Sequence, residues 1–338
     1  MNISIISFTD RGRQLSRRIA RSLPDAQVTQ YARAEGFTPF ESIRAFAQRA
    51  MAQDDAIIFV GAAGIAVRAV APYVRGKDVD PAVVVIDENG KFVISLLSGH
   101  IGGANRLTET LGQALGAIPV ITTATDGRGV FAVDDWAVQH GCVVGNTGCI
   151  KHISGALLRG ETVGLQCDFP ISGALPDGIT TEEVPENGIQ ISIFEREHTP
   201  FVHTLQLVPR IVHVGVGCRR NTPPEKLENW IERLLRDMQL DLRAVASVAS
   251  IDLKADEPAV LQLAQAWHVP AQFFTAQELE QVSGDFTVSD FVRRTTGTDN
   301  VCQRAAARAS GEGRCLLPKT AHDGMTVSIY CEDWRAAF

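Results

Sequence analysis

The sequence lacks the long hydrophobic runs of membrane proteins. Asp54, Asp55 and Arg68 bound its most apolar window, so no segment approaches the roughly 20 apolar residues that a membrane-spanning helix needs. The first residues, MNISIISFTDRGRQ, begin like a strand and reach Asp10 and Arg11 early, which does not fit a signal peptide. We therefore expect a cytoplasmic protein.

The sequence also lacks paired cysteine motifs and an excess of positive charge. Its seven cysteines show no CxxC spacing, which fits reduced thiols better than a disulfide framework or a structural zinc site. Cys142, Cys149 and His152 are irregularly spaced and no matching fourth ligand follows, so we interpret them as buried residues and predict no metal site. The net charge of −7 argues against nonspecific binding to nucleic acid, which needs a basic surface.

A third absence concerns nucleotide-binding motifs. Residues 9–13, which follow the first apolar strand, match neither a GxGxxG fingerprint nor a P-loop. A nucleotide-binding regulatory protein is therefore disfavoured. What is present is a chain of 338 residues with 45% hydrophobic and 21% charged residues. This balance supports buried cores, and the length suits two or three domains.

Residues 1–135 alternate short apolar strands with helical patterns. The alternation predicts a largely parallel sheet covered by helices on both faces. The predicted strands span 3–8, 27–30, 56–60 and 118–122, and the predicted helices lie near 11–23, 39–52, 64–73 and 104–115. A hairpin interrupts this pattern, because residues 83–86 and 92–94 flank a turn in which Asn89 and Gly90 can supply positive φ angles.

The pattern of apolar segments changes twice in the rest of the chain, at residues 136 and 209. Residues 136–208 are punctuated by glycine and proline and predict a small α+β linking domain, whereas residues 209–338 predict a second α/β domain. The strands predicted there span 211–216, 245–251 and 272–274. Thr222 is expected to cap a helix at 225–238, with Pro223 at its first position. The predicted fold class is α/β: two three-layer α/β domains with mostly parallel sheets, joined by the linking domain.

Four loops follow strands of the first domain, at residues 7–13, 61–65, 98–105 and 122–126. In open α/β sheets ligands bind outside the carboxyl ends of the strands, so these loops are predicted to form one carboxylate-binding site together. In the loop 98–105, glycines allow close backbone approach, the following helix offers N–H groups, and Ser98, His100 and Asn105 add polar side chains. Taken singly, the loop 98–105 also fits a plain strand-to-helix turn with Asn105 as a helix cap, and the loop 122–126 also fits a solvated loop with Asp126 as a cap.

Basic residues gather after strands in both predicted α/β domains. They are Arg68, Arg75 and Lys77 in the first domain and Arg219 with Arg220 in the second. Such clusters let an acidic chain bind a polyanionic small molecule, although each cluster alone also fits a solvated surface. Cys218 beside the two arginines is either a nucleophile with a lowered thiol pKa or a buried structural thiol. Asp252 and Lys254 belong to the site or form a surface ion pair.

Several motifs recur in an order that carries a family resemblance. In the first half they are GAAGIAVR at 61–68, DVDPAVV at 78–84 and SGHIGGAN at 98–105. In the second half they are VGVGCRR at 214–220, DLKADE at 252–257, GTDNVC at 297–302, and Lys319 followed by MTV at 325–327. Together they resemble the CbiG family, the cobalt-precorrin-5A hydrolases of anaerobic cobalamin biosynthesis. The resemblance covers nearly the whole chain, although the middle region contributes little.

Two positions depart from the family pattern. Asn221 stands where members often have glycine, a mild change because asparagine also tolerates the left-handed conformation. Gln303 stands where an acid is common, so no catalytic carboxylate is assigned to that position.

The resemblance implies a hydrolase that opens the ring-A lactone of cobalt-precorrin-5A and releases acetaldehyde, giving cobalt-precorrin-5B. The cobalt then belongs to the substrate, and no cofactor is expected on the protein. The substrate is a large planar polycarboxylate, which accounts for basic loops in an acidic chain. The expected partners are this corrinoid and, transiently, other enzymes of the cobalamin pathway, with no nucleic acid and no membrane.

His100 is the predicted general base, because an imidazole with a pKa of about 6.5 suits proton transfer at neutral pH. Backbone N–H groups around Gly102 and Gly103 are predicted to form an oxyanion hole. The predicted substrate-binding residues are Gly61, Gly64, Arg68, Ser98, Gly99, Gly102, Gly103, Asn105, Thr123, Thr125, Asp126, Gly217, Cys218, Arg219, Arg220 and Lys254. The alternative function is a noncatalytic protein that binds or channels a corrinoid intermediate, because carboxylate-binding loops serve both roles.

Overall fold

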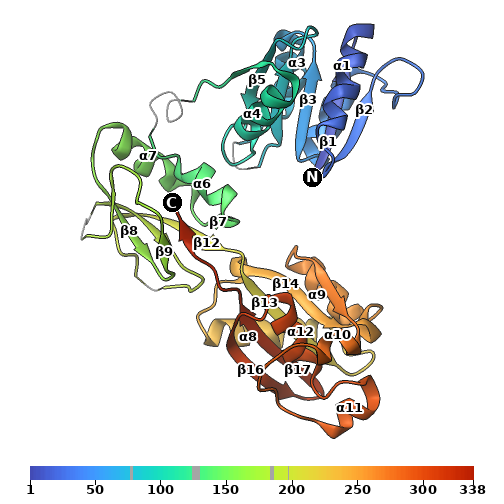
Figure 1. Cartoon of the computed structure of the whole chain (residues 1–338), viewed down its shortest axis with the longest axis vertical. Coiled ribbons are helices and arrows are strands. Elements are labelled where there is room, and N and C mark those ends of the chain that lie inside the picture. Colours follow the sequence, from blue (N-terminus) through green and yellow to red (C-terminus); the bar gives the residue numbers. More distant parts are fainter. Residues whose placement is uncertain (77–78, 124–129, 183–185, 197) are drawn as a thin grey trace. The chain divides into compact units, whose positions relative to one another are not determined.

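A computed structural model of the chain describes residues 1–76, 79–123, 130–182, 186–196 and 198–338. The chain folds into two compact units (Figure 1). The first contains residues 1–139 and 150–161, and the second contains residues 140–149 and 162–338. Within the described residues, no helix is long and apolar enough to cross a membrane. All seven cysteines are free thiols.

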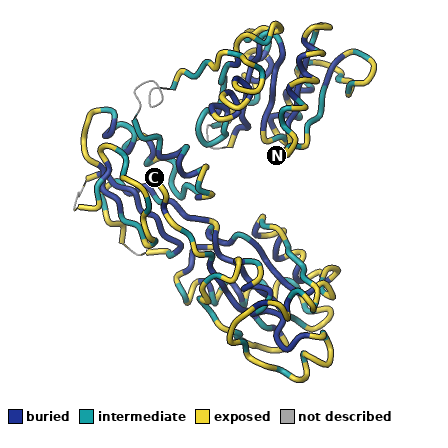
Figure 2. The backbone as a smooth tube through the Cα atoms, viewed as in Figure 1, coloured by how far each residue is buried: buried dark blue, intermediate teal, exposed yellow. Residues whose placement is uncertain are grey.

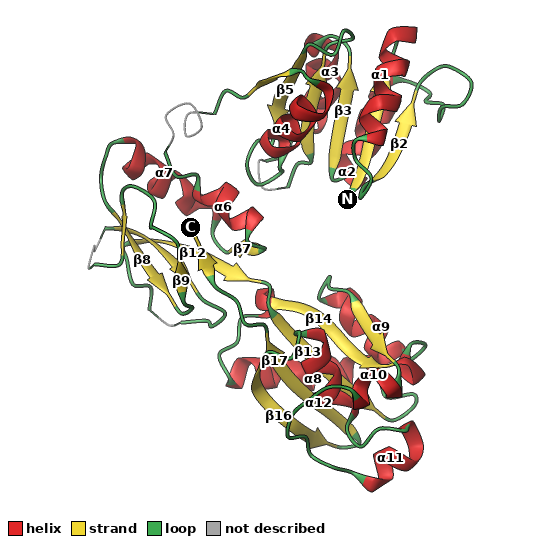
Figure 3. Ribbon diagram, in the orientation of Figure 1, coloured by secondary structure: helices red, strands yellow, loops and turns green. Residues whose placement is uncertain are grey.

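The first unit is built on a six-stranded sheet with the order β2-β1-β3-β4-β5-β6 (Figure 3). Its strands are β1 (Asn2–Ser7), β2 (Gln27–Tyr31), β3 (Ala56–Val60), β4 (Ala82–Ile86), β5 (Phe92–Leu97) and β6 (Ile118–Val120). Its helices include α1 (Asp10–Arg21), α2 (Ile43–Gln53), α3 (Ala63–Val70), η1 (Ala71–Tyr73), α4 (Ala104–Leu115), α6 (Val133–Gln139) and α7 (Ile150–Leu158).

Helices cover both faces of this sheet because successive strand residues point to opposite sides. On one face, Ile5 of β1 packs in a core with Leu15 of α1 and Leu111 of α4. On the other face, Ile6 packs in a second core with Phe46 of α2. Each such fully buried side chain stabilises the fold by about 1.5–3 kcal/mol. The central strands β1, β3 and β4 are the most continuously buried part of the sheet (Figure 2).

β5 reverses the direction of the sheet. The strands β1, β2, β3 and β4 run parallel, whereas β5 pairs antiparallel with β4 in the predicted hairpin, with Val83 opposite Leu97. β6 runs parallel to β5. The loops after β1 and β3 therefore lie at one end of the strands, whereas the loop after β5 and residues 121–123 after β6 lie at the opposite end. The prediction that all four loops form one site is wrong, because the hairpin turns the last two strands around.

The second unit carries two five-stranded sheets. The middle sheet has the order β10-β8-β11-β12-β7, and all of its pairings except that of β12 with β7 are parallel. Its strands are β7 (Cys142–Val144), β8 (Val163–Cys167), β10 (Ile179–Thr180), β11 (Asn187–Ile191) and β12 (His203–Pro209). The short helix η2 (Thr147–Cys149) belongs to the same unit.

The C-terminal sheet has the order β15-β14-β13-β17-β16. β13, β14 and β15 are parallel, and β17 and β16 are added antiparallel. The strands are β13 (Val212–Cys218), β14 (Val245–Ile251), β15 (Ala271–Phe274), β16 (Arg314–His322) and β17 (Met325–Cys331). The helices are α8 (Pro224–Asp237), η3 (Leu242–Ala244), η4 (Asp252–Lys254), α9 (Pro258–Ala266), α10 (Ala276–Glu280), α11 (Asp290–Thr296) and α12 (Val301–Ala309).

Helices also cover both faces of the C-terminal sheet. Leu227 of α8 packs with Val214 of β13 on one face, and Ala305 of α12 packs with Ala249 of β14 on the other. α12 lies very close to β13, because a Cβ on Gly215 would stand 1.8 Å from the backbone oxygen of Cys302 on α12. The α/β fold class is therefore confirmed: parallel strands are covered by helices on both sides.

The turn after β13 differs in detail from the prediction. α8 begins at Pro224 with Pro223 as its cap, so the predicted cap at Thr222 is wrong by one residue. The Thr222 hydroxyl instead donates to the carbonyl of Arg219 at 2.8 Å. Asn221 has a φ of +60°. This is the left-handed conformation expected at a position where members of the family often have glycine.

The end of the chain returns to the middle segment. β18 (Ala336–Ala337) pairs in parallel with β9 (Ile171–Ser172), and the rings of Phe169 and Trp334 meet edge to face with centroids 5.0 Å apart. This pairing joins positions 165 residues apart in sequence (336 against 171), which no local pattern predicts.

Candidate functional site

The loop between β5 and α4 forms a closed turn. The N–H groups of Gly103, Ala104 and Asn105 donate to the carbonyls of His100, Ser98 and Gly99 at 2.8, 3.1 and 2.9 Å. The Gly103 N–H is therefore occupied, contrary to the predicted oxyanion hole at this residue. The first turn of α4 correspondingly offers fewer N–H donors to an anion than the sequence suggested.

Packing explains two glycines of this turn. A Cβ on Gly99 would lie 2.7 Å from Asn105 Oδ1, and one on Gly102 would lie 2.4 Å from the Cβ of Ser98. Ser98 is buried, has a φ of +56°, and its hydroxyl has no hydrogen-bond partner among the described residues. A left-handed φ costs a residue other than glycine about 1–2 kcal/mol. The turn thus holds Ser98 in a strained conformation.

Asn105 joins neighbouring segments instead of capping α4. The cap is Gly103, and Asn105 is the second residue of the helix. Its buried amide accepts a hydrogen bond from Ser95 Oγ at 2.7 Å and donates one to Thr123 Oγ1 at 3.2 Å. The predicted role of Asn105 as a helix cap is wrong, and its contacts fix the loop against β5 and the segment after β6. Thr125 and Asp126 lie outside the described residues.

His100 is paired with a buried carboxylate. Its Nδ1 lies 3.1 Å from Oδ2 of Asp134 on α6, and the two side chains are only 15% and 6% exposed. A carboxylate at Nδ1 orients the imidazole and stabilises its protonated form, as in the His–Asp pairs of histidine general bases. Sequence analysis found His100 but missed Asp134, because an acidic first turn such as that of α6 is also an ordinary helix feature.

Gly61, Gly64 and Arg68 lie at the other end of the sheet, around the start of α3. Arg68 is exposed, and its Nη1 donates to the carbonyl of Gly64 at 3.3 Å. The ring of Phe8 covers Gly61, where an added Cβ would lie 3.2 Å from that ring. The length of the parallel strands therefore separates this group from the loop that carries His100.

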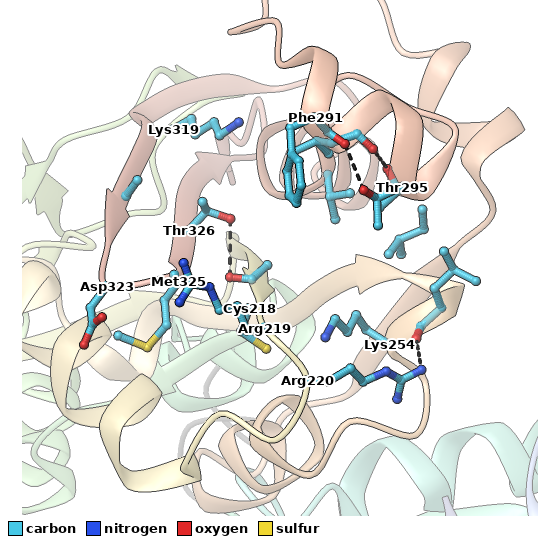
Figure 4. Close-up of a pocket in the computed structure, with 18 of the residues that line it drawn as sticks. Cys218, Arg219, Arg220, Lys254, Phe291, Thr295, Lys319, Asp323, Met325 and Thr326 are labelled. Carbon is cyan, nitrogen blue, oxygen red and sulfur yellow. Dashed lines mark hydrogen bonds between the residues drawn. The ribbon is translucent and has the colours of Figure 1, made fainter.

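A cavity of about 710 Å³ opens in the second unit at the carboxyl ends of β13 and β14 (Figure 4). It brings together all the predicted site residues of this half of the chain, namely Gly217, Cys218, Arg219, Arg220 and Lys254. The opposite wall comes from α11, with Phe291 and Thr295, and from the β16–β17 hairpin, with Lys319 and Thr326. Parallel strands end here, as expected for a ligand site in an α/β sheet.

A buried acid organises one side of the cavity. Glu257, only 1% exposed, accepts a hydrogen bond from Lys254 Nζ at 3.0 Å and another from the backbone N–H of Asn221 at 3.0 Å. Arg220 donates to Asp256 at 2.6 Å and to the carbonyl of Leu253 at 2.9 Å. The contact with Arg220 lowers the pKa of the Asp256 carboxyl. Arg220 and Lys254 are therefore held by the protein itself.

The other two cations of the cavity are differently placed. Within the described residues, neither Arg219 nor Lys319 forms an ion pair or a side-chain hydrogen bond. Arg219 lies against Gly324 in the hairpin turn, where an added Cβ would stand 2.7 Å from its Nε. The neighbouring acid, Asp323, is paired with Lys226. Arg219 and Lys319 are thus the cations that the cavity presents to a ligand.

Cys218 does not have the environment of an activated thiol. Burial raises its pKa above the ordinary value, and the opposing effects of Lys254 and Arg220 are smaller. The sequence-based expectation that two neighbouring arginines would lower this pKa is wrong, because desolvation of the thiolate outweighs them. The thiol is therefore protonated at neutral pH, which argues against Cys218 as the nucleophile.

Two wall residues were missed by sequence reasoning. Phe291 lies on α11 and is 72% exposed, a position that no short motif marks. Lys319 belongs to a motif that carried the family resemblance, yet nothing in the sequence placed β16 beside the loop after β13. Among the described residues, no three His, Cys, Asp or Glu side chains are grouped as metal ligands.

Comparisons with known proteins agree along the chain. The models Cobalamin synthesis G N-terminal, Cobalamin biosynthesis central region and Cobalamin synthesis G C-terminus match residues 45–126, 131–209 and 212–330. A protein of Salmonella typhimurium named cobalt-precorrin-5A hydrolase is 39% identical over 345 residues, covering 97% of each chain. One of the same name from Priestia megaterium is 28% identical, covering 96% of this chain and 94% of that protein.

One solved structure also matches along most of the chain. The crystal structure of a cobalamin biosynthesis protein G homologue from Sulfolobus solfataricus is 24% identical, covers 98% of this chain and 97% of that one, and superposes with a TM-score of 0.44. The assignment rests on the 39% identity with the Salmonella protein, which extends over 97% of both chains. The N-terminal, central and C-terminal family models support it, because they match successive segments of this chain. This chain therefore belongs to the CbiG family of cobalt-precorrin-5A hydrolases.

Proposed function

We propose that this chain opens the ring-A lactone of cobalt-precorrin-5A and releases acetaldehyde, giving cobalt-precorrin-5B. Membership of a family whose relatives are named for this substrate supports the hydrolysis. The observation that carries the proposal is the cavity of the second unit, with a volume of about 710 Å³. Small-molecule sites commonly have volumes of about 300–1,000 Å³, so this cavity has room for a substantial part of a tetrapyrrole.

The cavity walls suit a planar polycarboxylate. Ile251, Leu253 and Phe291 give apolar surface on which a flat conjugated ring can rest, and an exposed aromatic side chain is well suited to stacking. Arg219 and Lys319 offer positive charge to carboxylates. In this proposal the cobalt arrives with the substrate, and the protein supplies no metal.

The proposed chemistry begins with water. A general base takes a proton from a water molecule, which adds to the lactone carbonyl. The His100–Asp134 pair of the first unit is the candidate for this base. The C–O bond to the ring oxygen breaks, leaving a carboxylate on ring A and a free hydroxyl on the former bridging carbon. Loss of the hydroxyl proton then forms the carbonyl of acetaldehyde. The bond from that carbon to the macrocycle breaks, and the corrinoid π-system takes up the electron pair and later a proton.

The test measures acetaldehyde released by purified protein from cobalt-precorrin-5A. General base catalysis contributes about 10²–10⁴-fold, so His100→Ala should lower kcat by about that factor. Cys218→Ser is the matched comparison: it changes the thiol considered as a competing nucleophile and should leave kcat near the wild-type value. Wild-type rates in His100→Ala would remove the histidine from the base role, and inactivity of Cys218→Ser with normal folding would move the chemistry to the thiol.

The same experiment separates the enzyme from a carrier. A wild-type protein that binds the corrinoid but neither changes its absorption spectrum nor releases aldehyde would favour a noncatalytic binding or channelling role. We further propose that the protein acts in the cytoplasm, where free cysteines are maintained, and contacts other enzymes of the pathway only transiently.

A further inference from the structure

The cavity of the second unit contains more positive charge than it presents to a ligand. Arg219, Arg220, Lys254 and Lys319 all line it. Buried or neighbouring acids hold two of these, and the other two have no such partner among the described residues. The partition follows the geometry: Figure 4 shows Arg220 and Lys254 together on one side, with Lys319 across the cavity on the hairpin strand.

Glu257 is the centre of the first pair. Its carboxylate is 1% exposed and lies 3.0 Å from Lys254 Nζ and 3.9 Å from Arg220 Nη1. A carboxylate buried this deeply is stable only when it is paired and hydrogen-bonded, and here it also accepts the N–H of Asn221. Releasing Lys254 to a ligand would leave Glu257 uncompensated, so this lysine is costly to recruit.

Arg219 and Lys319 carry no comparable cost. Gly324 leaves room for the Arg219 guanidinium because it has no side chain. Lys319 lines the cavity from β16, and no described acid forms an ion pair with it. A carboxylate placed in the cavity therefore gains these two charges without breaking an existing ion pair. The two residues come from separate elements, the loop after β13 and the strand β16, so they suit two different carboxylates of one ligand.

We propose that Glu257 is a positioning residue that divides the cations of this cavity: Arg220 and Lys254 hold the loop after β13, while Arg219 and Lys319 bind two carboxylates of the corrinoid substrate. The inference rests on the proposed function for the identity of the ligand. It assigns Arg220 and Lys254, which sequence analysis predicted as substrate-binding residues, to the support of the site.

Binding is measured without turnover by absorbance titration with a cobalt corrin that carries free carboxylates, and with its fully methyl-esterified form as the uncharged comparison. Arg219→Gln and Lys319→Gln should each weaken binding of the acid by about 10-fold or more, the size of a hydrogen bond between charged groups. Each should also reduce the loss of affinity with added salt. The double variant Lys254→Gln with Glu257→Gln removes both charges of the buried pair, so it should change affinity for the acid by less than about 2-fold.

Two variants change the buried pair of Lys254 and Glu257, and one of them leaves no unpaired charge. The double variant Lys254→Gln with Glu257→Gln removes both charges of the buried pair, so it should melt close to the wild type and bind the probe with wild-type salt dependence. Glu257→Gln alone frees Lys254, so the salt dependence of binding should become steeper. A merely structural role of Glu257 would lower the melting temperature and leave that salt dependence unchanged.

Three results would overturn the inference. They are equal affinity for the acid and its ester, a loss in the double variant as large as that in Arg219→Gln, or a Glu257→Gln variant with unaltered salt dependence. Acetaldehyde release, followed in the wild type, keeps the two proposals apart. The expected binding pattern without acetaldehyde refutes the proposed hydrolysis alone. Acetaldehyde release with an ester that binds as well as the acid refutes this inference alone.

Discussion

Replacing Asp134 with asparagine tests the role of the His100 pair most directly. The change keeps the size of the side chain and removes its charge. In the structure, Asp134 Oδ2 lies 3.1 Å from His100 Nδ1, and the Asp134 side chain is 6% exposed. When His100 accepts a proton from water, the resulting imidazolium is stabilised by this neighbouring carboxylate, which the amide cannot replace.

The size of the effect follows from that contact. A hydrogen bond to a charged group contributes about 1.5–3 kcal/mol, and each 1.4 kcal/mol corresponds to about tenfold in rate. Asp134→Asn should therefore lower kcat by about 10- to 150-fold. KM should stay near the wild-type value, because the pair gains its extra strength only when the imidazole becomes charged.

The assay couples released acetaldehyde to alcohol dehydrogenase and follows NADH oxidation over a range of cobalt-precorrin-5A concentrations. Asp135→Asn is the matched control: it removes the same charge from the adjacent residue of α6, where the carboxylate contacts Gln139 at 2.6 Å. The control should retain wild-type kcat. Thermal melting of both variants shows whether a loss of rate reflects a loss of fold.

The double variant of His100→Ala with Asp134→Asn sharpens the test. If Asp134 acts through His100, the double variant loses no more activity than His100→Ala alone. The reasoning is refuted by a wild-type kcat in Asp134→Asn, by an equal loss in Asp135→Asn, or by losses that multiply in the double variant.

Three further predictions concern stability. Ser98→Ala removes a buried hydroxyl without a described partner, so urea unfolding should show equal or up to about 1 kcal/mol greater stability; clear destabilisation would contradict this. Gly215→Ala places a Cβ 1.8 Å from the Cys302 oxygen and should cost about 3 kcal/mol or more, whereas Gly148→Ala, with nothing within 4 Å, should be tolerated; equal melting temperatures would be inconsistent with the packing. Burial raises the pKa of Cys142 from 9.0 to about 12. The protonated thiol therefore contributes fully to the free energy of unfolding below pH 9, and this contribution is lost as pH rises towards 12, by about 1.4 kcal/mol per pH unit. A Cys142→Ala variant whose stability declines equally over this pH range would refute the contribution.

Local patterns in the sequence were sufficient for most of the secondary structure. The alternation of apolar strands and helical periodicity predicted the α/β class, and Asn89 with Gly90 predicted the hairpin between β4 and β5. These features depend on neighbouring residues, because side-chain periodicity and turn conformations are set within a few positions along the chain. The cations and glycines at 217–220 were likewise recognisable from their place after a strand.

The direction of strands had a consequence that the loop pattern alone did not reveal. The predicted hairpin reverses β5, and the parallel pairing of β6 with β5 carries the reversal to the loop after β6. Whether loops share an end of a sheet depends on how strands distant in sequence pair with one another. The polar loops at 61–65 and 98–105 look alike in composition and nevertheless lie at opposite ends.

By itself, the sequence determined the family, the fold class and the kinds of side chain available for chemistry. Only the tertiary structure decided which of these have partners. Asp134 contacts His100 although the two residues are 34 positions apart in sequence. Glu257 forms an ion pair with Lys254, whereas Arg219 lines the cavity without such a pair among the described residues. The physical reason is that the charge a site presents depends on burial and on long-range contacts, which no pattern of neighbouring residues specifies.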